Sequence, residues 1–128
     1  MKEFAIHAFE RIKDFYGLSK YQEGYPMLEV INDAQELLNG EYRDDYNGIM
    51  LNLHGLQCRE HVLVTLTHEY IHYMQCPRWM KRYYTMGHDY WTHPYEVEAF
   101  GRENELIHLF KDELQDTNEE GNQCLPTT

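Results

Sequence analysis

The chain has 128 residues, a length that predicts a single domain with one hydrophobic core. Its 11 Lys and Arg residues stand against 22 Asp and Glu residues, and the formal net charge is −11 with histidine neutral. Because a nucleic-acid backbone or an anionic membrane needs a net basic surface, this charge argues against both as partners.

The N-terminal segment, residues 2–16, is predicted to form an amphipathic helix. Its apolar residues recur at three- and four-residue spacing, and Gly17 follows at a position typical of a helix C-terminus. No secretory signal is expected, because no apolar segment at the N-terminus leads to a small-residue cleavage site. A membrane span is not expected either, since uncharged apolar runs reach only about six residues and a span needs ~20.

The next part of the chain contains short β-like runs separated by turn residues. Residues 27–31 are predicted to form a strand, whereas residues 32–39 are ambiguous and would suit a short helix. Residues 41–44 and 49–54 are predicted to pair as a hairpin, because an Asn-Gly pair between them is a strong turn signal.

Two further helices are predicted in the C-terminal half. Residues 59–75 show the clearest helical periodicity of the chain, and Pro77 prevents that helix from continuing. The second helix begins after His93 with Pro94 in the favoured first-turn position, and it is expected to run to about residue 114.

The organisation expected from these elements is one α+β domain over residues 1–115. After Lys111 the chain carries five acidic residues and no Lys or Arg. Residues 116–128 are therefore predicted to be an acidic, flexible tail.

Three cysteines form no CxxC pair, and any disulfide leaves one of them unpaired. Cys58 and Cys76 lie near opposite ends of a predicted helix of about 27 Å, which is too far for a bridge. We therefore expect reduced thiols and a cytoplasmic protein. Cys76 follows the helix closely, and we expect it to be a structural thiol.

The motif that carries chemistry is His68-Glu69-Tyr70-Ile71-His72, an HExxH sequence within the clearest helix. Residues i and i+4 share one helix face at about 6 Å, so both imidazoles can reach one metal ion. Glu69 lies one position round the helix, where its carboxylate can face a metal-bound water without binding the metal. Zinc held by three protein ligands keeps a fourth position open for that water.

A candidate third ligand begins an ExxA pattern, Glu96 to Ala99, 24 residues after His72. With this pattern the chain resembles the gluzincin branch of the zincin-like metallopeptidases, over Gly48 to about Glu103. The resemblance implies Zn²⁺ bound by His68, His72 and Glu96, with Glu69 as general base. The alanine, one turn after the ligand, would let the two helices approach closely.

The resemblance also implies a fold and a reaction. The fold would be a minimal zincin-like α+β fold, in which a small, mostly antiparallel sheet packs with an active-site helix and a following ligand helix. Residues 49–53 would form an edge strand along the cleft and pair with extended substrate. The reaction would be hydrolysis of a peptide bond in a protein or peptide substrate by a zinc-activated water, with Glu69 taking the proton.

Alternatives remain open for the third ligand. Glu96 would fall at the third helical position if His93 is the N-cap, where a glutamate is favoured simply for capping. Glu98 would replace it if the register slips. His88 lies 16 residues past His72 and resembles the third histidine of SprT-like proteases.

The donor for the developing oxyanion is expected within residues 78–93, and His88 is a candidate catalytic residue in that role. The candidates in this stretch are Tyr84, His88, Tyr90 and His93. Its two tryptophans, Trp79 and Trp91, are expected to fill the core.

Two other functional classes compete with the peptidase. One is a zinc-binding interaction protein that keeps the site without catalysis, although Glu69, which metal binding does not need, favours catalysis. The other is a metal-free helical adaptor in which HExxH is accidental. The sequence carries no signal for an oligomeric state.

Overall fold

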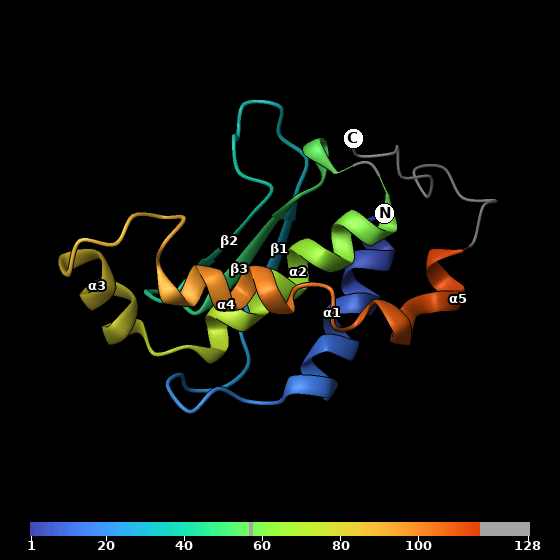
Figure 1. Ribbon diagram of the computed structural model, residues 1–128. Coiled ribbons are helices and arrows are strands. Elements are labelled where there is room, and N and C mark those ends of the chain that lie inside the picture. The colour runs from blue at the N-terminus through green and yellow to red at the C-terminus, as the bar shows by residue number, and fades with distance from the viewer. Residues whose placement is uncertain (57, 116–128) are drawn as a thin grey trace.

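The computed structural model describes residues 1–56 and 58–115, and their fold is α+β as predicted (Figure 1). The helices are α1 (Lys2–Tyr16), α2 (Arg59–Met74), α3 (Pro77–Thr85), α4 (Pro94–Arg102) and α5 (Lys111–Leu114), with 3-10 turns at Leu53–Gly55 and Ile107–Phe110. The strands are β1 (Met27–Ile31), β2 (Gly40–Arg43) and β3 (Gly48–Asn52). The predicted acidic tail, residues 116–128, lies outside the described residues.

The three strands form one sheet in the order β1-β3-β2. The predicted hairpin is confirmed, since β2 and β3 are antiparallel and Asn47 in their turn has a φ of 52°. The prediction of a mostly antiparallel sheet is wrong for the other pair, because β1 runs parallel to β3.

The side chain of Asn52, at the end of β3, explains the parallel pairing. Its Oδ1 accepts a hydrogen bond from the Asp33 amide, and its Nδ2 donates to the carbonyls of Asp33 and Glu36. These bonds hold the turn after β1 beside the end of β3. The chain then reverses and returns along the other edge of β3 as β2, and residues 32–39 form no helix.

The position of β3 corrects a second expectation. It is the central strand, buried at all five residues, and not the edge strand along the cleft. The edge strand on the side of the predicted site is β2, which contacts α2. Any backbone pairing with an extended ligand on this side of the sheet would therefore involve β2.

Helix α2 lies in the middle of the molecule, between α1, the sheet and α4 (Figure 1). Its Tyr70 and Tyr73 are fully buried, and their hydroxyls donate to the carbonyls of Gly17 and Gly24. These bonds anchor the segment after α1 to α2. The helix that carries HExxH is thus held on several sides.

The predicted long C-terminal helix is wrong beyond Arg102, where α4 ends. Gly101 weakens its last turn, because glycine is a poor helix former. The chain then turns, and Leu106 and Phe110 become buried, with the Phe110 ring edge-on to Phe4 of α1 at 6.1 Å between centroids. The break allows this segment to close the core against α1.

Three smaller expectations can be compared with the structure. Cys58 is disulfide-bonded, contrary to the expectation of reduced cysteines, whereas Cys76 is a free thiol. The two tryptophans do not fill the core, since Trp79 is 39% exposed and Trp91 is 74% exposed. Within the described residues, no helix has the length and apolar character needed to cross a bilayer.

Candidate metal centre

The two histidines of the HExxH motif lie on one buried face of α2. His68 and His72 are 7% and 8% exposed, and their ring centroids are 4.9 Å apart. The surrounding residues of α2 bury the helix against the sheet and α1, so the direction of both imidazoles is set by the core. This is the geometry that the motif predicts.

Helix α4 brings the third donor to them. The Oε1 atom of Glu96 lies 2.9 Å from His72 Nε2 and 3.2 Å from His68 Nε2. One ligand atom from each of the three residues lies within 4.8 Å of the others. Ala99, one turn further along α4, is completely buried, which is consistent with the close approach of α4 to α2.

The alternatives for the third ligand have other partners. His93 is indeed the N-cap of α4, but its own Nδ1 accepts from the Tyr95 amide, and Glu96 faces the histidine pair. Glu98 accepts hydrogen bonds from Gln75 and Arg102. His88 is half-buried and lies beside Thr92, with 3.3 Å between Nδ1 and Oγ1.

Hydrogen bonds on the far side of each imidazole set its tautomer. Glu103 Oε2 lies 2.8 Å from His68 Nδ1, and Gln75 Oε1 lies 2.7 Å from His72 Nδ1. The Gln75 amide is oriented by its NH₂ group, which donates to the Tyr95 carbonyl and to Glu98. Both Nδ1 atoms therefore donate a proton, which leaves each Nε2 of a neutral ring with a lone pair.

This arrangement could hold a metal ion. Two Nε2 lone pairs and a carboxylate oxygen converge on one point, and lone pairs repel unless a proton or a metal ion lies between them. Without a metal both rings would have to be protonated: burial lowers the pKa of His68 and His72, but the bonds to Glu96 and the charge of Glu69 outweigh it and raise both. Two nitrogens and one carboxylate oxygen are a ligand set typical of catalytic zinc.

The pKa of Glu96 reflects the same contacts. Burial favours the neutral acid, yet the hydrogen bonds to His68 and His72 outweigh burial and lower the pKa of Glu96 to about 2. Glu96 is therefore a carboxylate at neutral pH, which is the form that binds a metal ion.

Glu69 is held apart from the three donors by the sheet. Its Oε1 accepts a hydrogen bond from the Tyr42 amide of β2 at 2.9 Å, which fixes the carboxylate against the edge strand. Burial raises the pKa of Glu69 above its ordinary value, although the two histidines oppose the shift. A raised pKa suits a group that takes and returns a proton.

A cavity of about 330 Å³ opens beside these residues. Its walls come from β2 (Gly40–Tyr42), from α3 (Met80, Lys81 and Tyr84), from Tyr90, and from the His68, Glu69, His72 and Glu96 side chains. Cys76, expected to be purely structural, also lines it, whereas His88 does not.

Of the four candidate oxyanion donors, the structure places two at the cavity. Tyr84 and Tyr90 line it, while His93 is buried with its Nε2 bonded to the Met80 carbonyl. Burial, followed by the charge of Glu96, raises the pKa of both tyrosines, that of Tyr90 to about 12. Both phenols are therefore protonated at neutral pH and able to donate a hydrogen bond.

The residues that sequence reasoning missed are Gln75 and Glu103. Glu103, the C-cap of α4, follows Glu96 by seven residues, or two helical turns. That spacing predicts that both carboxylates lie on the same side of the helix. Gln75 carried no such signal, since it is the residue at which α2 ends and only its partners on α4 orient it.

Comparison with known proteins finds no match: no family model, no curated protein and no solved structure corresponds to this chain.

Proposed function

We propose that this protein is a zinc-dependent metallopeptidase. The observation that carries the proposal is the convergence of His68 Nε2, His72 Nε2 and Glu96 Oε1 at the edge of a cavity. Three protein ligands beside open space are typical of catalytic zinc, whereas structural zinc sites are closed by four. The presence of Glu69 at the same cavity, not needed for metal binding, favours catalysis over simple binding.

Zinc, when bound, supplies a Lewis acid that lowers the pKa of a water and polarises a carbonyl. Glu69 then acts as the general base, taking a proton from the attacking water and passing it to the leaving amine. The Tyr42 amide holds one oxygen of Glu69, so the other is left to exchange the proton. Gln75 and Glu103 orient the two imidazoles and increase their basicity.

The substrate would be an extended peptide lying between β2 and α3. Strand β2 is an edge strand at the cavity, so its outward backbone groups, apart from the Tyr42 amide that binds Glu69, offer pairing of the kind seen in β-augmentation. Tyr84 or Tyr90 would donate to the oxyanion that forms as water adds to the carbonyl. The resemblance to gluzincins, drawn from HExxH and ExxA, is consistent with this arrangement.

Metal content is the first test. Freshly purified protein should contain about one equivalent of zinc by inductively coupled plasma mass spectrometry. Less than about half an equivalent, with no uptake of added zinc, would contradict the metal centre.

Activity is the second test. Wild type should cleave members of a peptide library or a denatured protein, and Glu69→Gln should lose at least 10²-fold in kcat/KM while keeping its zinc. Equal cleavage by both proteins would remove the catalytic assignment. Zinc binding without any cleavage would favour the non-catalytic interaction protein.

A further inference from the structure

Helix α3 differs in charge from the rest of the molecule. It carries Arg78, Lys81 and Arg82 and no acidic residue, in a chain with a net charge of −11. None of its residues is buried. Its basic side chains are therefore not used to build the core.

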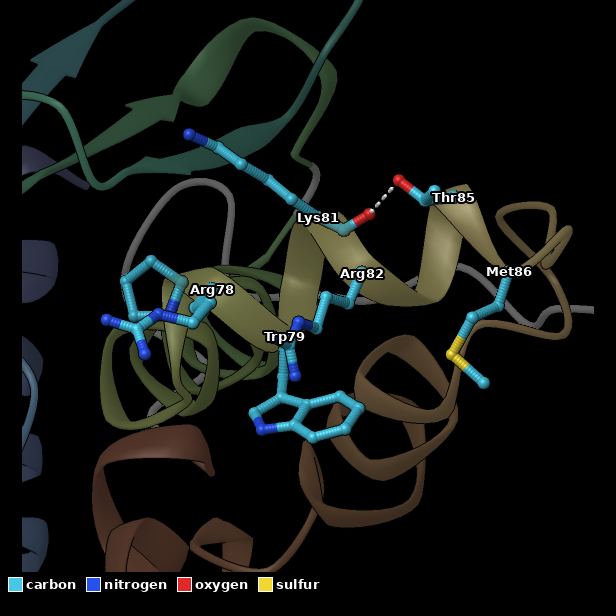
Figure 2. A pocket seen from close by; sticks show the side chains of 7 residues that line it. Arg78, Trp79, Lys81, Arg82, Thr85 and Met86 are labelled. Atoms are coloured by element: carbon cyan, nitrogen blue, oxygen red, sulfur yellow. Dashed lines mark hydrogen bonds between the residues drawn. The ribbon is translucent and has the colours of Figure 1, made fainter.

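Lys81 is the basic residue that reaches the metal cavity. It lines that cavity together with Met80 and Tyr84, and it also borders the outer groove of α3 shown in Figure 2. In that view its side chain extends away from Trp79 and Arg82, on the other side of the helix (Figure 2). The Arg82 guanidinium instead lies over the Trp79 ring, 5.0 Å from its centroid.

No described residue forms an ion pair with Lys81, and it is the one Lys or Arg among the described residues that line the cavity. On the wall formed by β2, Glu41 is paired with Arg43 at 3.5 Å, and Asp44 also lines the cavity. Glu69 accepts a hydrogen bond from the Tyr42 amide, and Glu96 contacts the two histidines. The cavity is thus positive at α3 and negative at β2.

We propose that the site selects acidic peptide segments, with the Lys81 ammonium pairing an Asp or Glu side chain of the bound peptide. The proposal rests on the proposed peptidase function and deepens it by naming the substrate class. An acidic side chain is repelled by Glu41 and Asp44 and attracted to Lys81, so the charge fixes which wall it faces. A basic side chain in the same place would be repelled by the Lys81 ammonium.

The cleavage test uses fluorogenic peptides that differ only in having Glu, Gln or Lys at one position at a time. At one position, wild type should prefer Glu over Lys by roughly tenfold or more in kcat/KM. Lys81→Glu should reverse that order, measured as the ratio of kcat/KM for the Glu and Lys peptides. Arg82→Glu is the matched control, because it makes the same change in net charge on a side chain outside the metal cavity, and it should keep the preference for Glu.

A binding test separates this proposal from catalysis. Zinc-loaded Glu69→Gln protein should bind the fluorescent Glu peptide more tightly than the Lys peptide by anisotropy, and adding Lys81→Glu should reverse that difference. Binding of this kind without cleavage by wild type would overturn the peptidase and leave the acidic ligand standing. Cleavage or binding with no charge preference, or a preference that Lys81→Glu and Arg82→Glu change equally, would overturn the role of Lys81. The absence of both cleavage and binding would overturn both proposals.

Discussion

Helices α2 and α3 follow one another in the chain and line the same cavity, but they are built differently. Eleven residues of α2 are buried, among them all three chemical residues of HExxH, whereas none of α3 is. The reactive groups thus belong to the core, where each rotamer is fixed by its neighbours. Helix α3 has no buried residue, so we expect substitutions of its exposed side chains to cost little stability. The comparison predicts large, metal-linked effects at α2 and its partners and small stability effects at α3.

The largest effect is expected from removing the ligand that α4 contributes. Glu96→Ala leaves two histidines and should reduce zinc from about one equivalent to near zero, with loss of cleavage. Val97→Ala is the control on the same helix, since Val97 is exposed and is not among the residues of the metal cluster. Metal content after dialysis measures the difference, and equal zinc in both variants would contradict Glu96 as the ligand.

A smaller effect is expected one step from the metal. Glu103→Gln weakens the acceptor at His68 Nδ1 and should lower zinc affinity by about 10- to 100-fold, measured by competition with a chromophoric chelator. Glu105→Gln, in the same turn but bonded to Tyr16 and Arg102, should leave the affinity as in wild type. If both variants lose affinity alike, the cause is the turn and not the carboxylate–imidazole bond.

The contact between β2 and α2 can be broken at Gly40. A methyl group there would lie 2.7 Å from Thr65 Cγ2 and 3.2 Å from Glu69 Cγ, so Gly40→Ala should lower the free energy of unfolding by about 1–3 kcal/mol. Gly101→Ala meets no atom within 4 Å in α4 and should be neutral or stabilising by up to about 1 kcal/mol. Urea unfolding of both variants tests the pair. A neutral Gly40→Ala would show that the two elements can separate at no cost.

The smallest effect is expected at α3. Lys81→Gln removes an exposed charge with no ion-pair partner among the described residues, so the free energy of unfolding should change by less than about 0.5 kcal/mol. The midpoint of urea unfolding measures it. A loss above 1 kcal/mol would mean that α3 is part of the structural core and would end the contrast with α2.

Local sequence patterns predicted the structural features that depend only on residues close together in the sequence. The i, i+4 spacing of His68 and His72 places both on one helix face wherever that helix packs. The Asn-Gly turn predicted the β2–β3 hairpin. These two predictions hold because they need only the period of a helix or the geometry of a turn. The ExxA pattern after Pro94 favoured Glu96 only through the resemblance to gluzincins.

The predictions that the structure overturned depended on contacts between segments that are distant in the sequence. The parallel pairing of β1 with β3 follows from the Asn52 side chain holding the turn after β1, and the break after α4 follows from burial of Leu106 and Phe110. His88 was a reasonable candidate by spacing, yet the loop that carries it directs it to Thr92. The spacing of residues along the sequence carries no information about such long-range contacts.

The sequence by itself determined that His68 and His72 share one face of a helix, with Glu69 one position round it, because backbone geometry repeats every 3.6 residues. Only the tertiary structure decided that Glu96 and not His88 faces that pair, that Gln75 and Glu103 fix the two tautomers, and that Lys81 of α3 and Glu41 of β2 line the same cavity. Those outcomes depend on how α2, α3, α4 and β2 pack together, and packing is set by the whole core.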